Sequence, residues 1–336
     1  MLHQPTPTLS QPQNNERLAE LAAVKLRGLL REHLETDIAE VQRLGGGACA
    51  RVDDAAWVYF PTSAPGLLGS AVVWAASQEC SEINLIVDQH SSELAHAASG
   101  FAEPRPAVWK AIERRIEQAD PVAPEIPAAP ACAELTAELA SAGLDVVADH
   151  GVWIGEINGL EVARVGSRNG ECSVDIGVGA HDQFASAALN QDNEFGESLA
   201  SVIAQVEPHR RAGAAPHAIG RLVRSRWLRA QLMGQPELVG LDSLNPIPLL
   251  HPRPGLLESQ PAAGLGERGG SAVLVVCTVG LDLGIAETAA GLIALHQPDE
   301  VVVVVPPRDR HQRIVEAAAR LAVPAVVVAV EGEWSD

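Results

Sequence analysis

Two carboxylates near the middle of the chain, Glu161 and Asp175, are the residues best suited to metal or acid–base chemistry. The Asn-Gly pair within 167–170 is typical of a β-hairpin turn, and the segments on both sides have strand-like composition. A hairpin centred on this turn brings the two acids close together on neighbouring strands. Such carboxylates repel each other unless one is protonated, an arginine intervenes or a metal bridges them. The pattern therefore suggests a Mg²⁺ or Mn²⁺ site, with Asp182 as a third candidate ligand.

A structural interpretation of the same acids stays open. Arg164 or Arg168 can pair with one of them, or one acid can point to water, and neither arrangement needs a metal. Alternation along a strand places Arg164 on the opposite face from Glu161. Asp182 is also a good N-cap for the helix that follows it.

The second group of candidates consists of arginines that follow the hairpin. Residues 208–236 contain no acid and six arginines, whereas residues 134–207 contain 13 acids and only two arginines. The spacing of apolar residues predicts a helix over 217–234 whose buried stripe leaves Arg221 and Arg224 projecting away from it. This surface either binds phosphate or carboxylate groups or is a solvated helix that pairs with the acids of its own domain.

The third group lies after two apolar strands near the C-terminus. Ligands of open parallel sheets bind beyond the carboxyl ends of the strands, and Thr278, Arg308 and Arg310 follow these ends. Together with the N-terminus of a helix near residue 283, they are candidates for binding an anion. The loop lacks a GxGxxG pattern, so a dinucleotide site is not expected, and the alternative is a plain surface loop.

The shortage of lysine excludes several classes of enzyme. Lys25 and Lys110 are the chain's two lysines among 24 Lys and Arg residues, and neither follows a glycine. P-loop proteins, protein kinases, Schiff-base enzymes and Ser–Lys hydrolases each need a placed lysine. The five cysteines are odd in number and lie at least 31 residues apart, which predicts buried free thiols in a reducing cytoplasm.

The overall charge bears on the partners of the protein. The 336 residues include 43 Asp and Glu against 24 Lys and Arg, a net charge of −19. Nucleic acid is disfavoured as a partner, because affinity for it depends largely on neutralising phosphates. The N-terminal sequence does not resemble a signal peptide, and no apolar run approaches the length of a membrane span. We therefore expect a cytoplasmic protein without a membrane partner, which binds another protein or a small anionic ligand.

The elements that must position these residues are predicted from the alternation of apolar strands and amphipathic helices. This alternation indicates an α/β and α+β fold, with two βαβαβ (Rossmann-like) units, N- and C-terminal, docked around a central α+β domain. Composition sets the boundaries as a disordered tail 1–16, an N-terminal α/β unit 17–116, a Pro-rich linker 117–132, a central α+β domain 133–244, a Pro/Gly-rich linker 245–270 and a C-terminal βαβαβ unit 271–336.

The central domain partly resembles the core of the PD-(D/E)XK nucleases. The resemblance consists of a helix carrying Glu134 or Glu138, then three strands with Glu161 and Asp175, then a helix. It implies that the strand acids bind a divalent metal that activates water for phosphodiester hydrolysis. The position of the family's lysine is Gly177 in this chain, so the catalytic cation of the family is missing.

The stretches GLEVARV, VDIGVGAHD and VVCTVGLDL also resemble a family of actinobacterial hypothetical proteins. That resemblance implies no activity and assigns no residue a role. Two hypotheses follow from the sequence. The first is a binding or scaffold protein. The second is a metal-dependent nuclease, or an inactive relative, that uses Glu161 and Asp175, with Arg164 as a candidate cation and Arg221 and Arg224 on the phosphates. The net charge favours the first.

Overall fold

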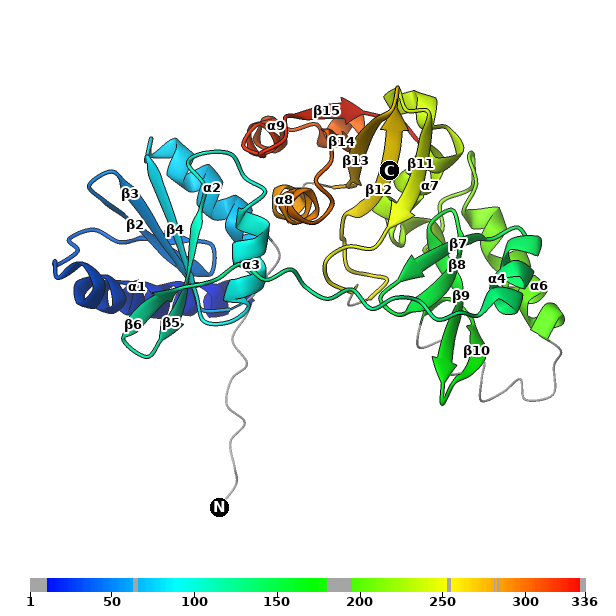
Figure 1. Cartoon of the computed structure of the whole chain (residues 1–336), viewed down its shortest axis with the longest axis horizontal. Coiled ribbons are helices and arrows are strands. Elements are labelled where there is room, and N and C mark those ends of the chain that lie inside the picture. The colour runs from blue at the N-terminus through cyan, green and yellow to red at the C-terminus, as the bar shows by residue number, and fades with distance from the viewer. Residues whose placement is uncertain are drawn as a thin grey trace, which may run out of the picture. The chain divides into compact units, whose positions relative to one another are not determined.

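The computed structural model describes residues 11–62, 66–179, 195–252, 255–280, 282 and 284–332. The chain forms two compact units, Met1–Ala123 (unit 1) and Pro124–Asp336 (unit 2), each with its own sheets (Figure 1). Among the described residues, no helix has both the length and the apolar character that a membrane span requires. The mixed α/β class predicted from the sequence is confirmed.

Unit 1 is built on a six-stranded sheet in the order β1-β2-β3-β4-β5-β6, in which β3, β4 and β5 are parallel. The strands are β1 (Gln42–Leu44), β2 (Gly47–Val52), β3 (Ala55–Phe60), β4 (Glu82–Val87), β5 (Ala107–Ile112) and β6 (Arg115–Gln118). Helices α2 (Leu67–Ser77) and α3 (Ser91–Ala98) connect the parallel strands, so the predicted βαβαβ order is confirmed here.

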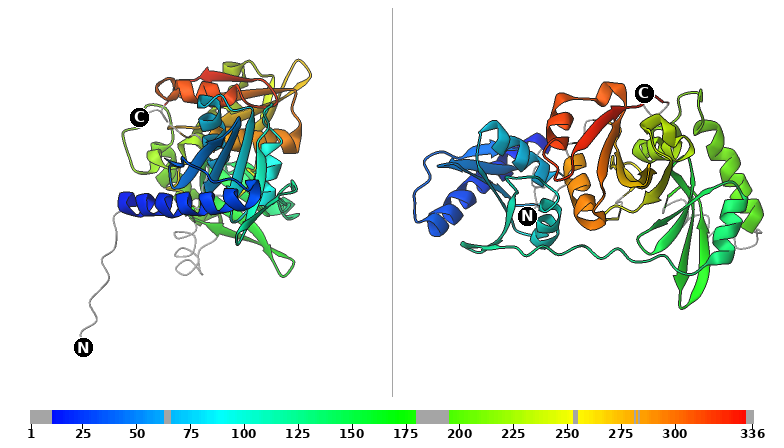
Figure 2. Two further views of the ribbon diagram at one scale, coloured as in Figure 1. Left: turned by 90° about the vertical axis from the view of Figure 1, so that its left-hand side faces the viewer. Right: turned by 45° about the horizontal axis from the view of Figure 1, so that its top comes forward.

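The helix α1 (Gln11–Leu34) closes the core of unit 1. The helix lies against the sheet (Figure 2), and its residues Leu26, Leu29 and Leu30 are buried in one cluster with Trp57 and Tyr59. Residues 11–16 belong to α1, so that part of the predicted disordered tail is wrong, and residues 1–10 lie outside the described residues.

Unit 2 begins with a four-stranded antiparallel sheet in the order β10-β9-β8-β7. Its elements are α4 (Ala133–Ser141), β7 (Asp145–Asp149), β8 (Val152–Ile157), β9 (Leu160–Arg168), β10 (Glu171–Ile176) and α6 (Phe195–Val206). The helices α4 and α6 pack on one face of this sheet through a buried apolar cluster (Figures 1 and 2). The predicted order of helix, antiparallel strands and helix is present.

The β9–β10 hairpin confirms the predicted Asn-Gly turn and corrects its register. Asn169 and Gly170 both have positive φ, 54° and 84°, the conformation that favours this pair in two-residue hairpin loops. The turn is centred one residue later than we expected from the sequence. Asp175 therefore lies opposite Arg164 and not opposite Glu161.

A β-bulge overturns the predicted alternation along β9. Glu156 of β8 lies opposite Glu161, but Gly155 lies opposite Ala163, so Val162 has no partner of its own in the ladder. The additional residue puts Glu161 and Arg164 on the same face of the sheet. The simple alternation of strand residues predicted opposite faces. That prediction is wrong because the bulge interrupts the two-residue period, and nothing in the local sequence indicates a bulge here.

The rest of unit 2 is a five-stranded sheet in the order β11-β12-β13-β14-β15. Its strands are β11 (Ser243–Ile247), β12 (Ala262–Arg268), β13 (Ser271–Cys277), β14 (Glu300–Val305) and β15 (Ala325–Ala329). The helices α8 (Gly284–His296) and α9 (Gln312–Ala318) connect the parallel strands β13, β14 and β15. The second predicted βαβαβ order is confirmed, and it belongs to a different sheet from the first.

The predicted linker 245–270 contains β12 and most of β11, so these two parts of it belong to the sheet. Its Pro and Gly content misled the prediction. Pro246 is tolerated because β11 is an edge strand. Gly264 lies under Leu244, whose Cδ1 would be 2.8 Å from an added β-carbon, so glycine here permits close packing between strands.

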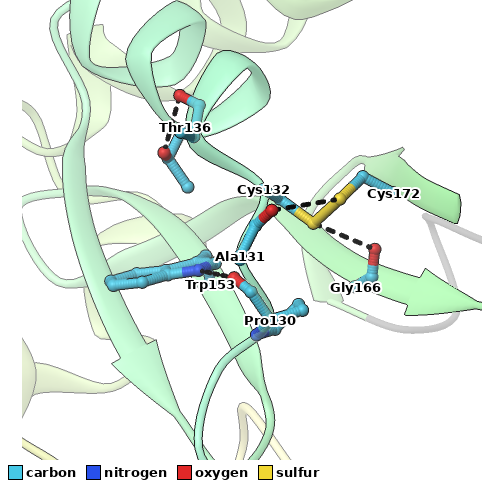
Figure 3. The surroundings of a disulfide bond; sticks show 8 residues. Pro130, Ala131, Cys132, Thr136, Trp153, Gly166 and Cys172 are labelled. Atoms are coloured by element: carbon cyan, nitrogen blue, oxygen red, sulfur yellow. Dashed lines mark hydrogen bonds between the residues drawn. A yellow bond between two sulfur atoms is a disulfide. The ribbon is translucent and has the colours of Figure 1, made fainter. Parts of the chain in front are cut away.

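The prediction of five free thiols is wrong. Cys132, at the start of α4, and Cys172, on β10, form a disulfide with 5.8 Å between their Cα atoms (Figure 3). The other three cysteines, Cys49, Cys80 and Cys277, are free and buried. A separation of 40 residues carries no sequence signal for pairing, because it is the fold of the sheet that brings β10 beside the start of α4.

Candidate anion-binding pocket

The arginine-rich segment of unit 2 is divided by a left-handed residue. Helix α7 covers Arg224–Gly234, and a short 3₁₀ turn covers Ile219–Arg221. Between them Val223 has φ 40°, so the continuous helix predicted over 217–234 is broken and begins at Arg224. The backbone of α7 lies so close to the β8–β9 turn that a β-carbon on Gly159 would collide with the backbone of Arg226. Since Gly159 also has φ +77°, glycine is required at this position.

Two arginines of α7 are fixed by acids of the four-stranded sheet. Arg226 bonds one carboxylate oxygen of Glu156 and one of Asp149, each at 2.6 Å. Arg229 bonds the other oxygen of Glu156, also at 2.6 Å. The side chain of Glu156 is 1% exposed, so this is a buried ionic network that joins α7 to β7 and β8. For these two arginines, the interpretation as partners of the domain's own acids is the one that the contacts support.

The network also sets the protonation of its members. Burial alone would raise the pKa of Asp149, but the charge of Arg226 and hydrogen bonds from His150 and Arg226 outweigh it, and the pKa is lowered. Burial would likewise lower the pKa of Arg226, but Glu156 and Asp149 raise it. Both partners are therefore held in their charged forms.

A further arginine, Arg210, holds the segment before α7 in place. It is fully buried, its guanidinium lies 4.2 Å from the centre of the Trp227 ring, and it donates to the carbonyl oxygen of Leu222 at 2.8 Å and to that of Asn158. Burial lowers the pKa of Arg210 to about 9, an effect that the charge of Glu156 partly offsets. This cation is held mainly by backbone carbonyls, which gives it a structural role.

A pocket opens at the start of α7. Its volume is about 820 Å³, counted out to the open solvent at its mouth. Two further arginines, Arg221 and Arg224, line it beside Ser225 and His251. The lining also includes two acids, Asp149 and Glu258, and the apolar residues Ile247, Pro248, Leu249, Leu256, Leu257 and Pro261. The lining of the pocket thus combines cationic and apolar residues, a combination found in small-molecule sites.

The cations around Arg224 repel one another. Its pKa is lowered by partial burial and by the nearby positive charges of Arg308 and Arg221, while Asp309 acts in the opposite direction. Asp309 also accepts a hydrogen bond from the backbone N–H of Gly280 at 2.6 Å, which fixes its carboxylate beside the loop after β13. The charges at this end of α7 therefore favour the entry of an anion.

The predicted anion-binding residues are only partly brought together. Arg221 and Arg224 line the pocket, and Arg308 is close enough to Arg224 to affect its pKa. Thr278 is fully buried, and its hydroxyl oxygen has no hydrogen-bond partner among the described residues. Its neighbour Val279 lines the pocket and donates its N–H to Ser225 Oγ at 3.2 Å. Arg310 is exposed and does not line the pocket.

The predicted metal-binding and catalytic acids are engaged with arginines. Both carboxylate oxygens of Glu161, which is 1% exposed, accept hydrogen bonds from Arg164 at 2.8 and 3.0 Å. Asp175 lies 3.8 Å from Arg168. Within the described part of the chain, no three His, Cys, Asp or Glu side chains are grouped so that they could hold a metal. Asp182 lies outside the described residues.

Sequence reasoning missed the acids that orient α7 and the loop that lines the pocket. Glu156 and Asp149 are 70 and 77 residues from Arg226, so no local pattern links them. The segment 247–263, which includes the connection between β11 and β12, was interpreted as part of a linker. The separation of an acidic hairpin from a basic segment was the one signal that pointed to their pairing.

Comparisons with known proteins add no further information. No family model, curated protein or solved structure matches the chain.

Proposed function

We propose that the protein is a binding protein that holds a small organic anion in the pocket at the start of α7. The observation that carries this proposal is the presence of Arg221 and Arg224 in one pocket, with Arg224 repelled by Arg221 and Arg308. A bound phosphate or carboxylate relieves this repulsion. Guanidinium groups suit such anions, because their planar fork matches two oxygens at once.

The apolar residues of the lining restrict the chemical class of the ligand. Leu249, Leu256 and Ile247 offer no partner for a second charged group, so they favour a ligand with one anionic end and an uncharged, largely apolar body. Gln260 also lines the pocket, and its side-chain amide oxygen is buried without a hydrogen-bond partner in the described part of the chain. A donor group on the ligand fits this position.

The nuclease alternative receives less support. It needs two accessible carboxylates near one cation, but Glu161 is buried and both its oxygens are bonded to Arg164. We propose the cytoplasm as the location, although the Cys132–Cys172 disulfide removes the free-thiol argument for it. Fractionation of the cells that make the protein tests this location directly. The net charge of −19 keeps nucleic acid a disfavoured partner.

Isothermal titration calorimetry tests the proposal, with inorganic phosphate, phenyl phosphate and benzoate as probes for the full chain. We expect phenyl phosphate to bind more tightly than inorganic phosphate, since it also covers apolar lining. Arg224→Gln should weaken binding by about 10- to 150-fold, the loss expected for about 1.5–3 kcal/mol of charge-assisted hydrogen bonding. Arg313→Gln, an exposed arginine of α9, is the matched control. Equal binding by the Arg224→Gln variant and the wild type would refute the proposal.

A further inference from the structure

The Cys132–Cys172 disulfide joins two residues of very different accessibility. Cys172 is exposed on β10, which is an edge strand of its sheet. Cys132 is 4% exposed and is the N-cap residue of α4, with its sulfur 3.8 Å from the carbonyl oxygen of Gly166 (Figure 3). A dissolved thiol therefore has access to the bond from the Cys172 side.

The remaining cysteines are poor participants in thiol chemistry. Burial raises the pKa of Cys49 to about 11 and that of Cys277 to about 12. The pKa of Cys80 is also raised, mainly by burial, despite the opposing charge of Arg51. Because the thiolate is the reactive form, buried thiols of this kind are inert near neutral pH. The chain thus restricts exchange chemistry to one pair of its five cysteines.

We propose that this disulfide is a site of thiol–disulfide exchange with a dithiol reductant, and that the incoming thiolate attacks the sulfur of Cys172. Cys132 is then the leaving group. Its position at the N-terminus of α4 stabilises the departing thiolate through the helix dipole and the free N–H groups of the first turn. Glu134, the acid of that turn, is exposed, so solvent screens its opposing charge. Exchange is faster when the leaving thiol has the lower pKa.

The step is balanced in atoms and electrons. The first thiolate of the reductant forms a bond to Cys172 Sγ as the Cys132–Cys172 bond breaks, and Cys132 departs as a thiolate that takes up a proton. The second thiol of the reductant, as its thiolate, attacks the mixed disulfide and releases Cys172 as a thiolate, which is protonated in turn. Two electrons pass to the protein, and the reductant leaves as a disulfide.

Reduction of the disulfide should loosen β10 more than the segment before α4. The segment before α4 keeps other contacts with the sheet, since Trp153 Nε1 donates to the Pro130 carbonyl oxygen at 2.8 Å and Gly151 N–H to that of Pro127 at 2.9 Å. β10 has β9 as its neighbour within the sheet and loses its covalent tie to α4. Reduction should therefore speed hydrogen exchange in Glu171–Ile176 more than in β8.

Peptide mapping of the native full chain tests this proposal. The purified protein is treated with reduced glutathione, a monothiol that leaves mixed disulfides in place, and is then quenched with acid and digested. We expect glutathione on Cys172, with roughly tenfold less on Cys132. After dithiothreitol, alkylation without denaturant should label Cys132 and Cys172 but not Cys49, Cys80 or Cys277.

Variants that keep one of the two cysteines test the accessibility of each thiol without the disulfide. In Cys132→Ser the remaining Cys172 thiol should react quickly with oxidised glutathione, whereas in Cys172→Ser the remaining Cys132 thiol should react slowly. Three results would each overturn the proposal. These are five free thiols in protein purified without reductant, glutathione mainly on Cys132, and a disulfide that dithiothreitol reduces only in denaturant.

Discussion

The buried carboxylate of Glu156 offers the sharpest test of how α7 is held. Glu156→Gln keeps the shape of the side chain but removes the charge that Arg226 and Arg229 share, each bonded at 2.6 Å. Asp149 then remains as the carboxylate bonded to Arg226, and Arg229 has lost its carboxylate partner in the network. The side chain of Arg229 is 3% exposed, so water cannot replace the lost partner.

The expected loss is large. Breaking a buried ion pair from one side costs about 3–5 kcal/mol of unfolding free energy, because a charge is left without compensation in a poorly hydrated site. For a unit the size of unit 2, each kcal/mol lowers Tm by roughly 2–4 °C, so we expect a decrease of about 10 °C.

Hydrogen exchange of β8 and β9 peptides, measured at increasing urea in the full chain, reports the unfolding of unit 2 separately from unit 1. The matched control is Glu171→Gln, an exposed acid of the same sheet, which should change stability by no more than about 0.5 kcal/mol. Combining Glu156→Gln with Arg229→Met should recover part of the loss, because the unpaired cation is removed as well. A loss for Glu156→Gln as small as that of the control would refute the account of the network.

Three further predictions concern other parts of unit 2. Gly159→Ala should lower the melting temperature and move the start of α7, because the new methyl group collides with helix backbone, whereas Gly170→Ala meets no atom within 4 Å; calorimetry and near-UV circular dichroism of both variants check this. Cys132→Ser, compared with the oxidised wild type, should lower the unfolding free energy by about 4 kcal/mol, since the bond to Cys172 closes a loop of about 40 residues, and urea unfolding measures the loss. The pKa of Asp149 is lower in the folded protein than the value near 4 of the unfolded carboxyl, so its charged form stabilises the fold above about pH 4. This contribution is lost as pH falls through the folded pKa. The difference in unfolding free energy between wild type and Asp149→Asn should therefore narrow from about pH 6 to about pH 3, as measured by urea unfolding at each pH.

Local patterns in the sequence predicted the local parts of this fold. The Asn169-Gly170 pair indicated the hairpin, because both residues tolerate positive φ. The apolar strands and amphipathic helices indicated both βαβαβ orders, because each element carries its own periodicity. The prediction that the two arrangements dock stays a prediction.

The predictions that were wrong concern features that depend on contacts between residues far apart in the sequence. The bulge at Val162 shifts Arg164 onto the face of Glu161, and only the pairing with β8 sets its position. Most of β11 and all of β12 were interpreted as a linker, because Pro and Gly are typical of loops. In the structure, proline is tolerated in the edge strand β11, and glycine in β12 permits close packing against β11.

The candidate site shows the same division. Its arginines were predicted from composition, since six of them lie in a segment without acids. Which of these arginines are bonded to acids was not predictable from the sequence. All four of Arg221, Arg224, Arg226 and Arg229 line the pocket, but Arg226 and Arg229 are also bonded to acids that lie 70 or more residues earlier. Only the packing of α7 between the two sheets of unit 2 makes that distinction.

The proposed function depends on one claim, that the pocket at the start of α7 binds an anion through Arg221 and Arg224. The most direct measurement is an anomalous difference map from crystals of the full chain soaked in selenate, a heavy analogue of sulfate and phosphate. We predict a peak within about 4 Å of both guanidinium groups, the usual limit for an ion pair, and no peak there in crystals of the Arg221→Gln/Arg224→Gln variant. A wild-type map whose peaks all lie elsewhere, or an unchanged peak in the variant, would contradict the claim.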